Sequence, residues 1–129
     1  MHLKYAILYV EDVTRSIEFY EQVFGLERTM IHESGDYGEL NTGDTTLSFS
    51  SRRLMTELGK SPGTPDPSSP TFEIAFETHD VSAALEKARS AGATVVQEVR
   101  EEVWGQTTAY VIDNNGYLVE ICSPVQGAS

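Results

Sequence analysis

Glu120 is the residue whose position in this sequence most clearly suggests chemistry. It lies in the apolar run LVEIC at positions 118–122, which is typical of a β-strand. A carboxylate inside an apolar strand breaks the local pattern, and such breaks gather at functional sites. Leu118 and Cys122 share its side of the strand, so we expect Glu120 to face a cavity rather than water. A carboxylate in that setting can move a proton, hold a metal ion or bind a cation.

Two short strands and a tight turn must position this carboxylate. Residues 106–112 and 117–122 are predicted to be strands, and Asp-Asn-Asn-Gly at 113–116 is predicted to join them, with Asn and Gly supplying positive φ angles. Elsewhere the chain has no Ser-His-Asp arrangement, phosphate-binding loop or Cys-His zinc spacing.

The chain contains an internal repeat. Residues 73–81, EIAFETHDV, align with residues 5–13, YAILYVEDV, at an offset of 68. Asp12 and Asp80 are the matching N-cap residues of two predicted amphipathic helices. Each half therefore reads as strand, helix and three strands. The other predicted strands are 26–33, 36–41 and 45–51 in the first half, and 95–102, 106–112 and 117–122 in the second.

The repeat identifies four equivalent positions, two in each half. Tyr5 matches Glu73 in the first strands, and Ser48 matches Glu120 in the closing strands. The first half thus presents two hydroxyl groups, and the second half presents two carboxylates. For Glu73 two interpretations stay open, because it shares its face with Glu77 and that face suits either a cavity or water.

Composition narrows the class of protein. The 129 residues suit one domain, and the net charge of −11 argues against binding nucleic acid or an anionic membrane. The same charge is compatible with a cationic small molecule, although acidic surfaces also serve solubility. A single cysteine and the lack of a signal-type apolar run lead us to expect a cytoplasmic protein.

The repeated motifs resemble the vicinal oxygen chelate superfamily of glyoxalase, bleomycin-resistance and extradiol-dioxygenase proteins. The resembling segments are Tyr5–Val13 with SIEFYEQVFGLE, the EIAFETHDV return, and WGQTTAYVIDNNGYLVEI. The resemblance implies an α+β fold with two βαβββ modules whose curled mixed sheets surround a cavity, and a homodimer. We expect a single domain with module 1 at about 1–51, a Pro-rich linker at about 52–70 and module 2 at about 71–124.

The resemblance also implies where a metal ion is held in metal-dependent members of the superfamily. Carried over by position, those sites are Tyr5, Ser48, Glu73 and Glu120, where the family usually has His, Glu or Gln. Hydroxyl groups are poor ligands near neutral pH, because tyrosine ionises near pH 10. No cofactor is therefore favoured, and Mn, Ni, Zn, Mg or Fe on Glu73 and Glu120 is the alternative.

Two functions are compatible with these residues. The first is a small-molecule-binding protein of the bleomycin-resistance type, which holds an aromatic or cationic ligand in the inter-sheet cavity without metal. The second is a metal-dependent lyase, isomerase or dioxygenase of the glyoxalase type with Glu120 as catalytic residue. For Trp104 a core position and a stacking position at the mouth of the groove both stay open. The predicted ligand-binding residues are Tyr5, Ser48, Phe49, Glu73, Trp104, Tyr110 and Glu120.

Overall fold

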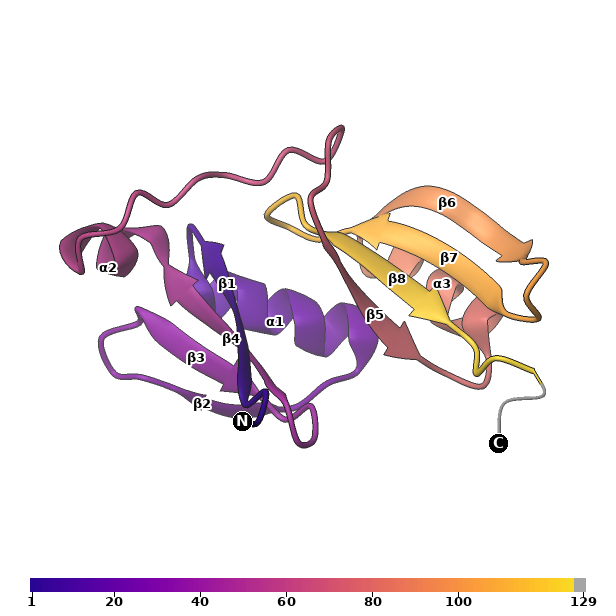
Figure 1. The fold of residues 1–129 in the computed structure, drawn as a ribbon, viewed down its shortest axis with the longest axis horizontal. Helices are drawn as coiled ribbons and strands as arrows, with labels where there is room; N and C mark the ends of the chain where they lie inside the picture. Colours follow the sequence, from indigo (N-terminus) through magenta and orange to yellow (C-terminus); the bar gives the residue numbers. More distant parts are fainter. Residues whose placement is uncertain (127–129) are drawn as a thin grey trace. The chain divides into compact units, whose positions relative to one another are not determined.

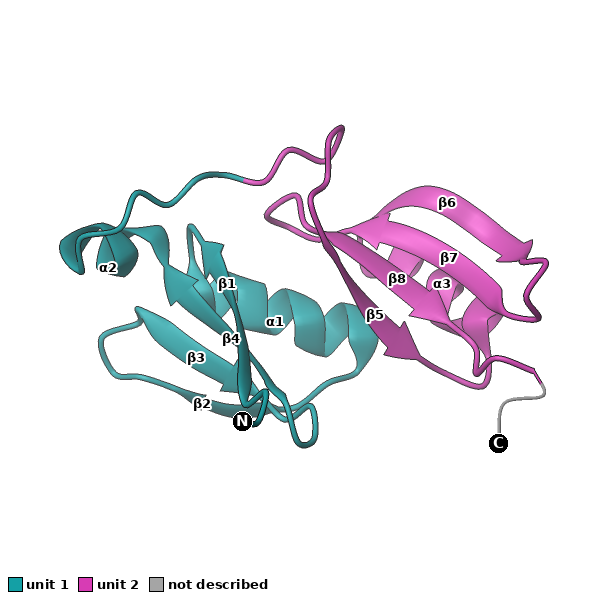
Figure 2. Ribbon diagram, in the orientation of Figure 1, with its two compact units in different colours: residues 1–64 teal, residues 65–129 magenta. Residues whose placement is uncertain are grey.

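The computed structural model describes residues 1–126 and divides the chain into two compact units, residues 1–64 and residues 65–129 (Figure 2). Unit 1 contains β1 (Tyr5–Val10), α1 (Val13–Phe24), β2 (Arg28–Ile31), β3 (Tyr37–Leu40), β4 (Thr46–Ser51) and α2 (Arg52–Glu57). Unit 2 contains β5 (Glu73–Glu77), α3 (Val81–Ser90), β6 (Thr94–Glu101), β7 (Thr107–Ile112) and β8 (Leu118–Cys122) (Figure 1).

The sheet of unit 1 has the strand order β1-β4-β3-β2, with β1 and β4 parallel and the other pairs antiparallel. Helix α1 begins where the Asp12 side chain accepts a hydrogen bond from the Arg15 amide, and it ends at Gly25 in the left-handed conformation. The helix packs closely on the sheet, since a Cβ atom at Gly38 would lie 3.1 Å from Val13. Tyr20 of α1 contacts Phe49 of β4 with ring centroids 5.1 Å apart, and both are fully buried.

Unit 2 repeats this architecture with the strand order β5-β8-β7-β6, again with one parallel pair. Asp80 caps α3 through the Ala83 amide, and the helix buries Val81, Leu85 and Ala88. The predicted α+β fold with two βαβββ modules is confirmed, because each unit begins with a strand, a helix and three strands in the same sheet order, and α2 follows only in unit 1.

Two local predictions need correction. The first residues of the predicted linker at about 52–70 instead form the six-residue helix α2, because the Ser51 side chain caps it and Met55 is buried. In the turn at 113–116 only Gly116 has a positive φ angle, because the Asp113 carboxylate holds the turn instead. Among residues 1–126, no helix has the length and apolar character that crossing a membrane requires.

Candidate functional site

The candidate site lies on the face of the unit 2 sheet that points away from α3, which we call the open face of unit 2. Strand alternation turns Val119 and Ile121, both buried, toward the helix and their neighbours toward the open face. The register aligns Ala75, Glu120 and Tyr110 across β5, β8 and β7. The open face is formed by Glu73, Ala75, Glu77, Thr108, Tyr110, Ile112, Leu118, Glu120 and Cys122.

A single tyrosine links the two predicted carboxylates. The Tyr110 hydroxyl lies 2.8 Å from Glu120 Oε2 and 3.0 Å from Glu73 Oε2. A phenol carries one proton, so at any moment it donates to only one of the two carboxylates. The structure thus brings together Glu73, Tyr110 and Glu120, three of the residues that the sequence predicted as ligand-binding.

Burial and the adjacent carboxylates keep the Tyr110 hydroxyl protonated. Burial raises its pKa well above the ordinary value for tyrosine, and the hydrogen bonds to Glu120 and Glu73 raise the pKa further. Cys122, on the same face, is buried, and this burial together with the charge of Glu120 raises the pKa of its thiol. Tyr110 therefore acts as a hydrogen-bond donor, and Cys122 as an unreactive thiol.

The corresponding face of unit 1, which we call the open face of unit 1, has the same register but different side chains. Ile7, Ser48 and Glu39 align across β1, β4 and β3, as Ala75, Glu120 and Tyr110 do in unit 2. Tyr5 and Ser48 hence occupy the positions of Glu73 and Glu120, as the repeat predicted. Its residues are Tyr5, Ile7, Tyr9, Met30, Tyr37, Glu39, Ser48 and Ser50.

Sequence reasoning missed the hydrogen bond that organises this face. The Tyr37 hydroxyl donates to Glu39 Oε2 at 2.8 Å. The two residues are two positions apart in the predicted strand 36–41, so strand alternation alone would have placed them on one face. In the register of the structure Glu39 lies opposite Ser48, in the position that Tyr110 occupies opposite Glu120.

Phe49 and Trp104, two further predicted ligand-binding residues, are not among the residues of the two open faces. Phe49 has no exposed surface and packs against Tyr20 on the helix side of its sheet, so it does not share a face with Ser48. Trp104 lies in the turn between β6 and β7, where its Nε1 donates to Gln106 Oε1 at 2.7 Å. Its side chain is 55% exposed, so the core position considered for Trp104 is wrong.

Comparisons with known proteins relate nearly the whole chain to one family. Residues 3–126 match the family model described as glyoxalase-like domain. The lactoylglutathione lyase of Escherichia coli O157:H7 is 28% identical over 94% of this chain and 91% of its own length. A probable lactoylglutathione lyase of Vibrio cholerae is 30% identical over 91% of this chain and 86% of its own length.

Solved structures agree with the fold. A glyoxalase/bleomycin resistance protein/dioxygenase from Nocardioides has a TM-score of 0.80 at 19% identity and covers 100% of this chain and 87% of its own. A glyoxalase-related enzyme from Fulvimarina pelagi has a TM-score of 0.81 at 16% identity, over 95% of this chain and 88% of its own. At these identities the likeness concerns the fold.

Proposed function

The chain belongs to the glyoxalase-like domain family, within the vicinal oxygen chelate superfamily that its sequence resembles, and we propose that it is a small-molecule-binding protein. The ligand binds on the open face of unit 2 and presents a cationic or hydrogen-bond-donating group to Glu73, Tyr110 and Glu120. The observation that supports this most is the single Tyr110 hydroxyl shared by two carboxylates.

The proposal follows from the balance of donors and acceptors. Each carboxylate accepts several hydrogen bonds, whereas the phenol donates one. The cluster therefore has spare acceptor capacity and concentrated negative charge, which an ammonium or amidinium group of a ligand satisfies through charge-assisted hydrogen bonds. Leu118 and Ile112, both partly exposed on the same face, supply apolar surface for the body of the ligand.

Glyoxalase-type proteins typically use a divalent metal, but the donor set here does not fit a resident catalytic ion. Such an ion needs about three protein ligands and an open position. Unit 2 offers two carboxylates, and the third group between them is a phenol that keeps its proton. Within residues 1–126, no three His, Cys, Asp or Glu side chains are grouped as a metal site.

A second candidate function is a lyase, isomerase or dioxygenase of the glyoxalase type. It is favoured by the relatives named lactoylglutathione lyase, which align over more than nine-tenths of this chain. In that case Glu73 and Glu120 are the residues that would hold a divalent ion. The homodimer and the cytoplasmic location stay predictions from the sequence.

A matched pair of probes tests the binding proposal. Benzamidine is a cationic aromatic amidine, and benzamide has nearly the same shape without the charge. We expect calorimetry to show benzamidine binding at least about tenfold more tightly, because charged hydrogen bonds are the stronger kind. Glu120→Gln removes this preference, whereas Glu77→Gln, which removes a charge from the same face without touching Tyr110, keeps it.

Two results would count against the proposal. Equal affinity for both probes, or equal losses in both variants, would show that the cluster recognises no cation. The second function has its own measurement: metal content after purification without a tag, followed by titration with Mn²⁺, Ni²⁺, Zn²⁺ and Mg²⁺. A stoichiometric ion that is absent from Glu120→Gln would favour the metal-dependent function.

A further inference from the structure

We propose that Asn115 and Gly116 form a self-modification site, at which the side-chain amide of Asn115 is lost as ammonia, and that the Asp113 carboxylate holds this reaction in check. The site lies in the turn between β7 and β8. The proposal goes beyond the function proposed above and does not depend on it.

The starting observation is the one Asn-Gly pair of the sequence. The chain has three asparagines, Asn41, Asn114 and Asn115, and only Asn115 precedes a glycine. The backbone nitrogen of a glycine is easily approached, because glycine has no Cβ atom. Asn115 and Gly116 are both partly exposed, so water reaches them. Asn41 and Asn114 are internal controls in the same chain.

The chemistry is an intramolecular attack, followed by the addition of water. The Gly116 nitrogen loses its proton and forms a bond to Cγ of Asn115, while the bond from Cγ to Nδ2 breaks and ammonia leaves. Water then opens the cyclic succinimide at either of its carbonyl carbons. The products are aspartate and isoaspartate, in which the main chain runs through the former side chain. Nothing is oxidised or reduced, and no cofactor is needed.

The structure keeps the attacking nitrogen protonated. The Gly116 amide donates to Asp113 Oδ1 at 2.9 Å and to the Asp113 carbonyl oxygen at 3.2 Å. Removing the amide proton would break these bonds and place a negative charge beside the carboxylate, which like-charge repulsion opposes. Asp113 is buried, so water screens this repulsion only weakly. The same oxygen accepts from the Asn115 and Tyr117 amides, which fixes the peptide groups on both sides of Gly116.

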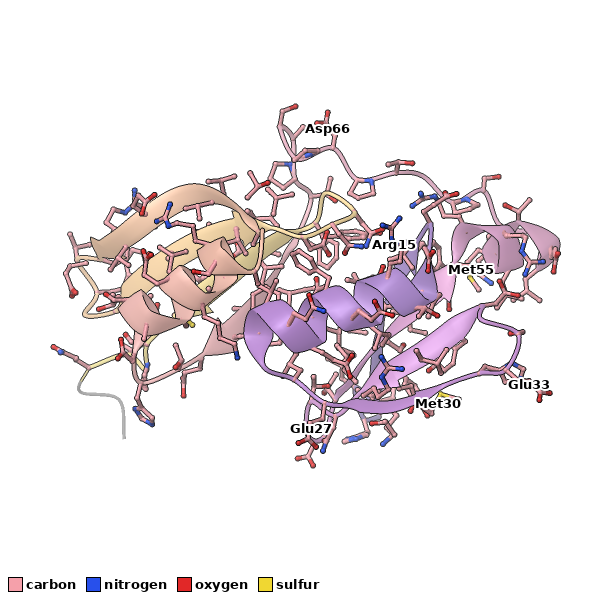
Figure 3. The ribbon with its side chains drawn as sticks, turned by 180° about the vertical axis from the view of Figure 1, so that it is seen from behind. Arg15, Glu27, Met30, Glu33, Met55 and Asp66 are labelled. Atoms are coloured by element: carbon pink, nitrogen blue, oxygen red, sulfur yellow. The ribbon has the colours of Figure 1, made fainter. Side chains whose placement is uncertain are left out.

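The proline-rich segment before β5 packs on the same glycine. A Cβ atom on Gly116 would lie 3.2 Å from the Pro65 carbonyl oxygen and 3.5 Å from Pro67 Cδ. Asp66, which lies between these prolines and is labelled in Figure 3, accepts hydrogen bonds at Oδ1 from the Ser68 amide and hydroxyl. Attack requires the peptide group before Gly116 to rotate, and this packing leaves it little room. The turn therefore reacts when it opens.

Conversion of Asn115 disturbs the strands that the turn joins. Isoaspartate lengthens the main chain of the turn by one carbon atom, so the amides that follow it no longer meet the Asp113 carboxylate. The turn leads directly into the register in which Tyr110 lies opposite Glu120 and donates to it. We expect the NMR signals of the Tyr110 and Glu120 amides to shift in the converted chain.

Mass spectrometry tests the proposal on the full-length chain at mildly alkaline pH, with tandem spectra locating the exchange of ammonia for water. In the folded wild type Asn115 should convert at least about tenfold more slowly than in the same chain unfolded in urea, because opening the turn breaks several hydrogen bonds. In folded Asp113→Ala the Gly116 amide keeps only its longer bond to a neutral carbonyl, so conversion should be at least about tenfold faster than in the wild type.

Two further variants separate the carboxylate from general stability. Leu85→Ala removes a buried side chain of α3 and lowers stability without touching the turn, so Asn115 should convert at close to the wild-type rate. Asp113→Asn keeps an oxygen acceptor without the charge, and it should accelerate conversion less than Asp113→Ala does. This variant tests the carboxylate even if the alanine variant does not fold.

Four outcomes would overturn the inference. Asn115 could fail to convert even in the unfolded chain, or it could convert equally fast in the folded and unfolded wild type. Equal acceleration in Leu85→Ala and the Asp113 variants would show that folding in general, and not the carboxylate, protects the site. Identical Tyr110 and Glu120 amide signals in the converted and unconverted chains would remove the link between the turn and these residues.

Discussion

Unit 1 and unit 2 each place a tyrosine–glutamate hydrogen bond on the open face of the same type of sheet, but they divide the roles differently. In unit 2 one tyrosine serves two carboxylates, Glu73 and Glu120. In unit 1 the one carboxylate of the open face, Glu39, takes the proton of Tyr37, and the buried Ser48 hydroxyl lies beside the same tyrosine. The comparison teaches that one backbone register supports two carboxylates on one hydroxyl donor in unit 2 and a single carboxylate with one tyrosine donor in unit 1.

The largest expected effect tests whether the two units are stabilised separately. Phe49→Ala empties a fully buried position beside Tyr20 in unit 1, and we expect a loss of about 3–5 kcal/mol in the free energy of unfolding. Native-state hydrogen exchange should accelerate at amides of β1, β3 and β4 and much less in unit 2.

The matched change in unit 2 is Ile121→Val, which trims one methyl group beneath α3. It should cost about 1 kcal/mol and leave exchange in unit 1 unchanged. Equal acceleration of exchange in both units by either change would show that they unfold together, and the comparison of independent copies would then fail.

The next effect concerns the turn that presents Glu120. Asp113 Oδ1 accepts hydrogen bonds from the backbone amides of Asn115, Gly116 and Tyr117, at 2.8, 2.9 and 2.9 Å. Asp113→Ala removes the carboxylate that these amides share, while the Gly116 amide keeps its bond to the residue 113 carbonyl oxygen, so we expect a loss of about 2–3 kcal/mol in thermal or chemical unfolding. Asn114→Ala, at an exposed position in the same turn, is the control and should change little. If both variants lose the same stability, the carboxylate is not what holds the turn.

Removing one hydroxyl from each open face compares the tyrosines directly. Tyr110→Phe and Tyr37→Phe each remove a donor to a carboxylate, and each should cost about 1–2 kcal/mol near neutral pH. We expect the larger cost at Tyr110, because two carboxylates lose their shared donor there. Equal losses in the free energy of unfolding at the two positions would show that the second carboxylate, Glu73, adds nothing to the hydrogen bond of Tyr110.

The pH dependence of stability is a second way to compare Tyr110 with Tyr37. In the folded chain the pKa of both hydroxyls is raised, so both keep their protons at pH values where an unfolded tyrosine, with a pKa of about 10, loses its own. Their contribution to stability is therefore complete below about pH 10 and falls as the pH rises further, toward the raised pKa. Relative to each Phe variant, the advantage of the wild type should shrink in alkaline solution. If denaturant titrations show that the extra stability of the wild type grows above pH 10, the pKa values of these tyrosines are not raised in the folded chain.

The sequence predicted the architecture because its signals are local and repeated. Asp12 and Asp80 mark two helix starts at the same offset that aligns the first strands of the two halves, and both prove to be N-caps. Strand alternation placed Glu120 with Leu118 and Cys122, which the register confirms.

The site itself was less predictable, because it depends on contacts between strands. That one Tyr110 hydroxyl reaches both Glu73 and Glu120 follows from side-chain conformations, which no strand pattern specifies. The exposed position of Trp104 follows from the path of a turn. Phe49 differs, since alternation already separates it from Ser48, and the sequence interpretation did not apply that rule to it.

The smallest expected effects come from ion pairs, one in each unit. In unit 1 Arg28 and Glu21 form a bidentate ion pair with two hydrogen bonds, Nε–Oε2 at 3.0 Å and Nη2–Oε1 at 2.9 Å. In unit 2 Arg89 reaches Glu98 through a single Nη2–Oε1 contact at 2.6 Å. All four side chains are partly exposed, so Arg28→Gln and Arg89→Gln should each cost little stability, because solvent weakens such pairs.

The geometry of the two ion pairs nevertheless predicts which variant loses more stability. The planar fork of Arg28 matches both oxygens of Glu21, whereas Arg89 divides its contacts between Glu98 and Glu86. The Arg28 pair also lowers the pKa of Glu21, so acid should remove part of its contribution as that carboxylate takes up a proton. We therefore expect Arg28→Gln to cost more at neutral pH and low salt, with the two variants converging in 1 M salt. A larger cost for Arg89→Gln at low salt would show that bidentate geometry does not decide the strength of ion pairs at this surface.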